Sequence, residues 1–140
     1  METEGHGLIV VDTNIIVYLL IRGEWTAKAL LLMDRDPEWI APSFWRIEFL
    51  NVLMNYARPG KLTAGDVRAI GKNSFQLAHL REEPVEGDQA LELALKYKIS
   101  GYDALFLSLA QDHQTLCITQ DKALRKAAPH LTKSLEEYLK

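Results

Sequence analysis

Short apolar runs alternate along the chain with longer helical patterns. Residues Leu8–Val11 form a continuous apolar run rich in β-branched side chains, which is typical of a central strand buried on both faces. Two further runs, 39–41 and 116–118, predict short buried strands. Pro42 is expected to close the first of these, because proline donates no ladder hydrogen bond. Residues 84–85 are a candidate edge strand.

Helical patterns fill the intervals between these runs, and capping residues mark where several of them begin. Thr63 with Asp66 has the spacing of a capping box, as has Ser134 with Glu137. The other candidate N-caps are Ser43, Asp88 and Asp121. Helices are expected over residues 14–20, 26–33, 43–57, 63–80, 89–97, 102–111, 122–128 and 134–140. Strands that alternate with helices need crossover connections, which predicts an α/β domain with a parallel sheet between layers of helices.

Composition places the chain among ordinary globular proteins. Of its 140 residues, 48% are hydrophobic and 25% charged, which suits one domain over residues 8–140. The polar residues 1–7 are expected to form a flexible leader. No apolar run approaches the ~18 residues of a membrane span, and no secretory signal is recognisable. A single cysteine, Cys117, fits a reducing compartment, so we expect a cytoplasmic protein without membrane contact.

The charge of the chain limits how it could hold nucleic acid. The formal net charge is -3, whereas proteins that bind nucleic acid through bulk charge are usually basic. Any phosphate partner must therefore be met by a local basic patch, by metal ions or by a partner protein. This makes the placement of the acidic residues the next question.

Two aspartates follow predicted strands directly. Asp12 ends the first strand, and Asp121 comes three residues after the strand at 116–118. Each has a simpler interpretation as the N-cap of the next helix. In open α/β sheets, however, ligands bind at the carboxyl ends of the strands, which is where both aspartates are expected.

Two further acids lie on helices that are otherwise apolar. Glu48 shares a stripe with Asn51 and Asn55 on the helix over 43–57, and this stripe is either the solvent face or the lining of a cleft. Asp103 shares the core-facing side of its helix with Phe106, where a carboxylate is costly unless something compensates it. Clustered carboxylates need a cation or a proton, and hard oxygen ligands select Mg²⁺ or Mn²⁺. No closely spaced Cys or His pairs favour zinc.

Four segments, taken together and in order, resemble the PIN-domain nucleases. They are LIVVDTNIIVYLL around Asp12, WRIEFLNVL around Glu48, SGYDALFLSLA around Asp103 and CITQDKALRKAA around Asp121. The likeness covers residues 8–131, and the length is similar to that of the VapC-type toxins of bacterial and archaeal toxin–antitoxin pairs. The resemblance implies a three-layer sandwich whose parallel five-stranded sheet has the order 3-2-1-4-5, with a short fifth strand near residue 131.

The same resemblance implies the site. Its catalytic and metal-binding residues are Asp12, Glu48, Asp103 and the more variable Asp121, holding one or two Mg²⁺ (or Mn²⁺) ions. The supporting residues are Thr13, Asn14, Asn51 and Thr119. The four histidines match no position of the family's site, so we interpret them as ordinary polar residues.

The function implied is a metal-dependent endoribonuclease, the toxin of a toxin–antitoxin pair. Its partners are an RNA substrate, a cognate antitoxin protein and a second copy in a homodimer. Candidate RNA contacts are Lys122, Arg125, Lys126, Arg22 and Arg46. Two alternatives stay open, a stand-alone RNA-processing nuclease and a non-catalytic RNA-binding domain. An aspartate-nucleophile phosphatase is disfavoured, because it needs a second aspartate where this chain has Asn14.

Overall fold

A computed structural model describes residues 7–140, so all but the last residue of the expected leader lies outside the described residues. The strands are β1 (Leu8–Val11), β2 (Glu38–Pro42), β3 (Leu80–Glu83), β4 (Cys117–Ile118) and β5 (Thr132–Lys133). The helices are α1 (Thr13–Leu20), α2 (Thr26–Arg35), α3 (Trp45–Ala57), α4 (Ala64–Phe75), α5 (Gly87–Tyr97), α6 (Gly101–Asp112), α7 (Lys122–Ala127) and α8 (Leu135–Leu139).

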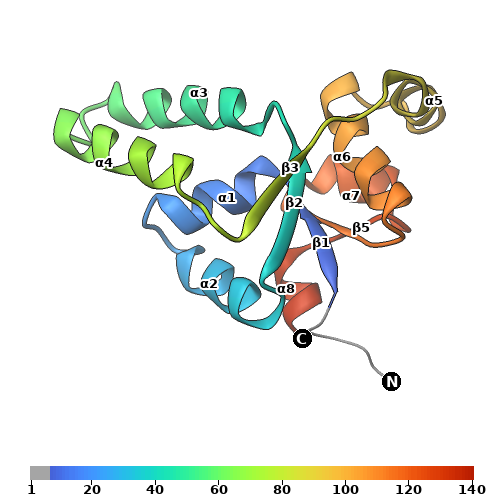
Figure 1. The fold of residues 1–140 in the computed structure, drawn as a ribbon, viewed down its shortest axis with the longest axis horizontal. Helices are drawn as coiled ribbons and strands as arrows, with labels where there is room; N and C mark the ends of the chain where they lie inside the picture. Colours follow the sequence, from blue (N-terminus) through green and yellow to red (C-terminus); the bar gives the residue numbers. More distant parts are fainter. Residues whose placement is uncertain (1–6) are drawn as a thin grey trace.

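The strands form one parallel sheet in the order β3-β2-β1-β4-β5, which confirms the predicted topology. Figure 1 shows α1 to α4 on one side of the sheet and α5 to α7 on the other, while α8 packs beside α2. The domain is therefore the expected three-layer α/β sandwich. Because the crossovers of α/β sheets are right-handed, the helices change sides where the strand order reverses, beside β1. No helix within residues 7–140 is long and apolar enough to span a membrane.

The core lies on both faces of the central strands. Ile9, Val10 and Val11 of β1 are buried, and this explains why the strand is a continuous apolar run. The largest buried side chains beside them include Trp39 and Phe106, which come from β2 and α6. The apolar runs of the sequence therefore mark the centre of the sheet correctly.

The third strand is the main correction to the predicted elements. We expected a helix up to residue 80 and a strand at 84–85, but α4 ends at Phe75 and β3 covers Leu80–Glu83. The sequence of β3, LREE, has no apolar alternation. It is an edge strand defined by its pairing with β2, and charged residues are common on such edges.

Smaller corrections concern Pro42 and two caps. Pro42 is part of β2 and pairs with Glu83, which is tolerated because β1 pairs with β2 no further than Ile40. Ser43 does not cap α3, whose N-cap position is Phe44 without a side-chain bond. Asp88 lies inside the first turn of α5 rather than before it.

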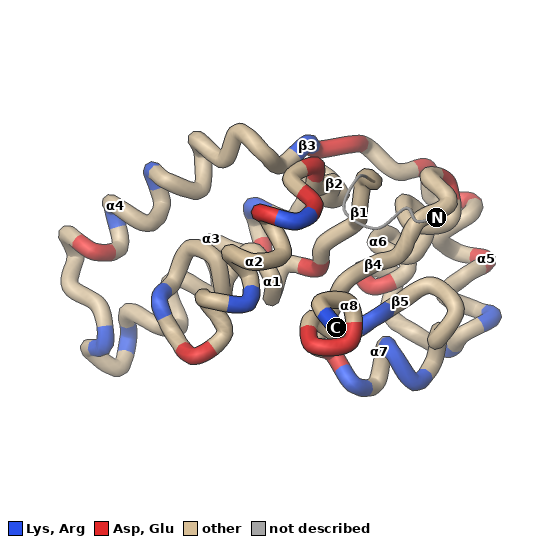
Figure 2. The backbone as a smooth tube through the Cα atoms, turned by 90° about the horizontal axis from the view of Figure 1, so that it is seen from below, with Lys and Arg blue, Asp and Glu red and all other residues tan. Residues whose placement is uncertain are grey.

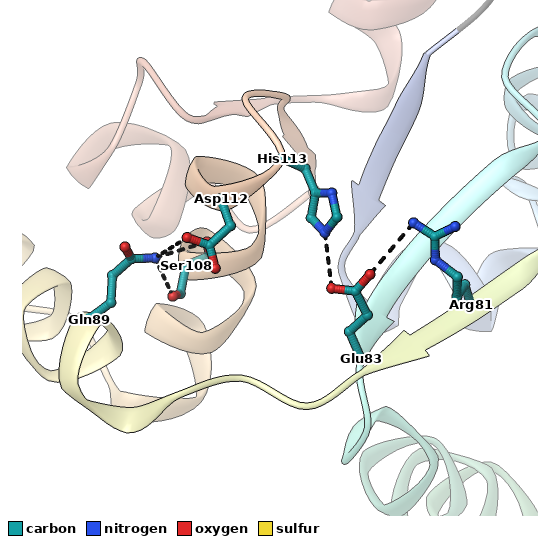
Figure 3. Close-up of polar contacts among 6 residues, drawn as sticks. All are labelled: Arg81, Glu83, Gln89, Ser108, Asp112 and His113. Carbon is teal, nitrogen blue, oxygen red and sulfur yellow. Dashed lines mark hydrogen bonds and ion pairs between the residues drawn. The ribbon is translucent and has the colours of Figure 1, made fainter.

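Polar contacts fasten β3 and α5 to α6, as Figure 3 shows. Glu83 Oε1 lies 2.9 Å from His113 Nε2, and its other oxygen pairs with Arg81 at 3.5 Å. The Gln89 amide on α5 donates to Ser108 Oγ at 2.6 Å and to Asp112 at 3.0 Å. These contacts hold the edge strand and the outer helix against α6, which carries Asp103.

Helix α3 buries only one face. Its buried side chains, Trp45, Phe49 and Leu53, are spaced four residues apart and lie towards the core. Ile47 and Met54 are 69% and 47% exposed. The apolar character on nearly all sides of this helix therefore does not mean that the helix is buried in the monomer.

The two faces of α3 are expected to respond differently to truncation. Phe49→Ala removes a side chain that is 1% exposed and should lower the free energy of unfolding by about 3–5 kcal/mol. Ile47→Ala should change it by less than about 0.5 kcal/mol in dilute protein. Urea unfolding monitored by circular dichroism measures both, and equal effects would contradict the one-sided packing.

Candidate active site

The candidate site lies at the carboxyl end of the two central strands, β1 and β4. Asp12 directly follows β1, and its backbone N–H donates to Ile118 O at 3.0 Å, so the ladder between the strands continues up to the acid. Thr119 and Asp121 follow β4. Because β1 and β4 are neighbours, residues separated by more than a hundred positions meet here.

Asp12 is the buried centre of the site. Only 9% of the Asp12 residue surface is exposed. Thr13 N donates to Oδ1 at 2.7 Å, and Thr119 Oγ1 donates to Oδ2 at 2.6 Å. Asn14 Nδ2 lies 3.4 Å from the same Oδ2. Three neighbouring donors therefore hold one carboxylate in a single orientation.

Two threonines, Thr13 and Thr119, link Asp12 to other acids. Thr13 Oγ1 donates to Glu48 Oε1 at 2.6 Å, and this bond draws the first turn of α3 towards the end of β1. Thr119 Oγ1 accepts from Asp121 N at 3.1 Å while its own proton goes to Asp12. Each threonine therefore connects the environment of Asp12 with a second carboxylate residue.

Asp103 approaches from the first turn of α6. Ser100 caps this helix by accepting from Asp103 N at 3.1 Å, which leaves the half-buried Asp103 carboxylate without a capping task. Asp121 does cap its helix, because its Oδ1 accepts from Leu124 N at 3.1 Å. Capping and a place in the site are therefore compatible for Asp121.

The pKa shifts indicate that the charges of the four acids influence one another. Burial raises the pKa of Asp12 to about 6; the bonds from Thr119 and Thr13 oppose this rise, and the charges of Asp103 and Glu48 add to it. The pKa of Asp103 is also raised, by burial and by the charge of Asp121. Each acid is therefore electrostatically connected to at least one of the others.

The donor set fits a hard divalent cation, although the carboxylates are not drawn together around one point. Among residues 7–140, no group of three or more His, Cys, Asp or Glu side chains is arranged to hold a metal ion. Asn14 Oδ1, however, is buried and has no hydrogen-bond partner among the described residues. Carboxylate and amide oxygens are what Mg²⁺ and Mn²⁺ prefer, and an added positive charge would relieve the raised pKa values.

Not every predicted residue lies at this site. Asn51 is exposed, and no hydrogen bond between described residues joins it to the acids, so its supporting role stays a prediction. Arg46 forms an ion pair with Glu82 at 2.7 Å and donates to Ser74 O, so it is engaged within the fold. Sequence reasoning missed Gln120, whose amide holds Leu135 N at 2.7 Å beside the site. The position of Gln120 between Thr119 and Asp121 is the sequence signal that could have identified it.

The fold and the site together define an α/β domain with an acidic centre at the point where the strand order reverses. A comparison with family models matches residues 9–129 to the PIN domain. The chain belongs to the PIN domain family, whose members are nucleases. Comparison with curated proteins finds no significant match.

Solved structures with the same fold span nearly the whole chain. PAE2754 from Pyrobaculum aerophilum is 20% identical, with a TM-score of 0.71, covering 95% of this chain and 87% of its own. The FitAcB structure from Neisseria gonorrhoeae is 15% identical, with a TM-score of 0.69 and coverage of 91% and 98%. A toxin–antitoxin complex from Klebsiella pneumoniae is 18% identical, with a TM-score of 0.64 and coverage of 91% and 97%. At these identities the likeness establishes the fold.

The raised pKa of Asp12 predicts how stability depends on pH without metal. The pKa of Asp12 in the folded protein, about 6, exceeds its ordinary value of 3.8. The stability that this residue contributes to the fold is therefore complete below about pH 4 and is lost as the pH rises through 6. Asp12→Asn should therefore stabilise the protein at pH 7.5 by about 1–3 kcal/mol, and much less at pH 4.5. Thermal melts in EDTA measure the difference.

Asp88→Asn is the matched control, because it alters an exposed carboxyl outside the site. We expect it to change stability by less than about 0.5 kcal/mol. If Asp12→Asn destabilises the protein equally at both pH values, the Asp12 carboxylate is a structural anchor whose charge is not disfavoured by the fold.

Proposed function

We propose that the protein is a metal-dependent endoribonuclease of the cytoplasm and the toxin of a toxin–antitoxin pair. The observation that carries the enzymatic part is the buried Asp12 carboxylate, which Thr13 (through its backbone N–H and its hydroxyl) connects with Glu48 and Thr119 (through its hydroxyl) connects with the Asp121 backbone. Membership of a nuclease family supports hydrolysis of a phosphodiester bond. RNA as the substrate, and Mg²⁺ or Mn²⁺ as the cofactor, are part of the proposal.

In this proposal Asp12, Glu48, Asp103 and Asp121 hold one or two divalent cations. When bound, such an ion lowers the pKa of a water molecule and neutralises phosphate charge. Thr119 and Thr13 orient the carboxylates, so that little reorganisation is needed when substrate arrives. Burial around Asp12 excludes bulk water and strengthens the electrostatic interactions at the site. Cleavage leaves 5′-phosphate and 3′-hydroxyl ends.

The toxin assignment rests on different support. One similar structure is described as a toxin–antitoxin complex from Klebsiella pneumoniae, and another is of VapBC2 from Rickettsia felis bound to a DNA fragment from their promoter. The proposed partners are therefore an antitoxin protein and a second copy of the chain. Helix α3 supplies a suitable surface for the second copy, because three of its apolar residues are exposed: Ile47, Leu50 and Met54.

Loss of the site acids should abolish cleavage without unfolding the protein. Asp12→Asn and Asp103→Asn each remove a charge from the site, and we expect Mg²⁺-dependent cutting of single-stranded RNA to disappear in both. Gel assays of labelled RNA measure cleavage, and circular dichroism checks the fold. Asp88→Asn, outside the site, should cut at the wild-type rate.

The same assay separates the alternatives. Cutting by the double variant Asp12→Asn/Asp103→Asn at the wild-type rate would refute the site. Wild-type protein that binds RNA but cuts none with either metal would favour the non-catalytic domain. A gene for a small antitoxin-like DNA-binding protein beside this one would favour the toxin over a stand-alone processing enzyme.

Metal binding should be visible as added stability. Because a cation bound at the site relieves carboxylate repulsion, Mn²⁺ at about 100 times its Kd should stabilise the folded state by about 2.7 kcal/mol. We expect a higher Tm for the wild type, and a much smaller rise for Asp12→Asn. An equal rise in both proteins would place the binding elsewhere.

A further inference from the structure

A depression of about 620 Å³ begins where the acidic site ends. Its walls include Tyr18 of α1, Trp25 just before α2, Gln120, and Lys122 and Arg125 of α7, with Ser134, Glu136 and Glu137 closing it. Gln120 lies between Thr119, which bonds Asp12, and Asp121. A polymeric ligand bound across the acids would therefore reach this depression next. Its volume is within the roughly 300–1,000 Å³ typical of ligand sites.

An aromatic pair forms one wall of the depression. The rings of Tyr18 and Trp25 are stacked, with centroids 5.9 Å apart and planes inclined by 26°. Lys28 Nζ lies 5.5 Å from the centre of the Trp25 ring. Both rings are half-buried, whereas Trp39 and Trp45 are buried completely in the core. A stacked pair of rings beside a cation suits a flat partner that carries negative charge nearby.

Cations from α7 form the opposite wall. Figure 2 shows the basic residues of α7 beside the acidic start of α8. Lys122 is exposed, and no ion pair among the described residues engages it. Arg125 makes one long contact, 3.5 Å to Gln120 O, and its Nε has no partner among the described residues. The Lys122 ammonium and the terminal Nη end of the Arg125 guanidinium are available for a phosphate, whereas the Arg125 Nε is buried.

Two acidic residues, Glu136 and Glu137, also line the depression, and Glu136 is hydrogen-bonded within it. Glu136 Oε1 accepts from Gln120 Nε2 at 3.1 Å. Its pKa is lowered by its own backbone hydrogen bond and by Gln120, and the charges of Lys28 and Arg125 contribute. The pKa of Tyr18 is raised, first by burial and then by neighbouring groups, of which Tyr56 contributes most and Asp12 and Glu136 contribute less.

We infer that this depression is a nucleotide subsite, in which a base of single-stranded RNA stacks on the Tyr18–Trp25 pair and its phosphate lies against Lys122 and Arg125. The inference rests on the proposed function, since it extends the path of the RNA beyond the acids. A stacked base must leave its helix, so the subsite selects single strands over duplexes. An arginine-bearing peptide is the competing occupant, but the positive charges of Lys122 and Arg125 in the lining disfavour it.

Binding is tested in Asp103→Asn protein, which keeps the RNA intact. A fluorescein-labelled single strand of about ten nucleotides is titrated by anisotropy. Trp25→Ala should weaken binding at least about fivefold, and Trp25→Phe, which keeps a ring, much less. Lys122→Ala, at an exposed position that cannot unfold the protein, should weaken binding and reduce the salt slope by about one. Phe75→Ala, an exposed ring on α4, is the matched control and should bind normally.

Cleavage by otherwise wild-type protein provides a second measurement. Trp25→Ala should raise KM for single-stranded RNA and leave kcat nearly unchanged, since it removes binding rather than chemistry. Affinity for duplex RNA of the same sequence should not change. If the Trp25→Ala and Lys122→Ala variants both bind and cleave RNA as well as the wild type does, the inference is overturned.

Two other outcomes separate this inference from the proposed function. If the wild type cuts no RNA but single-strand binding still depends on Trp25, the subsite stands and the nuclease proposal fails. If Trp25→Ala weakens binding of an arginine-rich peptide but not of RNA, the depression is a peptide site, and the inference is overturned while cleavage by the acids is unaffected.

Discussion

The hydrogen bonds that the Asp12 carboxylate accepts at the end of β1 are the constraint on which the rest of the site depends. A buried carboxylate is unfavourable unless hydrogen bonds or charges compensate it. Here the donors come from the start of α1 and from the residue that follows β4, so the site forms only when β1 and β4 are paired in register. The fold and the site therefore share the same interaction.

Convergence of the other acids follows from the architecture. Glu48 and Asp103 lie in the first turns of α3 and α6, which begin at the carboxyl edge of the sheet on opposite sides of it. Helix N-termini favour negative charge, and this offsets part of the repulsion among the acids. The compensation is incomplete, because the pKa values of Asp12 and Asp103 remain raised. Such a site is predisposed to take up positive charge.

The surface around this centre divides into parts with different character. Helix α3 exposes apolar side chains, which suits contact with another protein. Helix α7 carries Lys122, Arg125 and Lys126, and the Tyr18–Trp25 stack lies across from it. A chain of net charge -3 can thus present a local cationic and aromatic surface beside its acids.

Local patterns were sufficient for the elements whose residues carry their own signal. The β-branched run of β1 and the caps at Thr63, Asp121 and Ser134 were readable because each depends on neighbours within a few residues. The four acids were predicted as site residues from their places after strands and at helix starts, together with the resemblance to a family. The edge strand β3 was misplaced, because LREE has no strand pattern of its own and takes its conformation from β2.

Long-range contacts settled what no local pattern contains. The bond from Thr13 to Glu48 spans 35 positions and that from Thr119 to Asp12 spans 107, so neither could be read from spacing. The Tyr18–Trp25 wall faces α7 only after the sheet has brought distant segments together. A sequence specifies which groups are present and their short-range conformations. Distances between remote side chains depend on how strands and helices pack, and those distances decide which of the separate acids can act together.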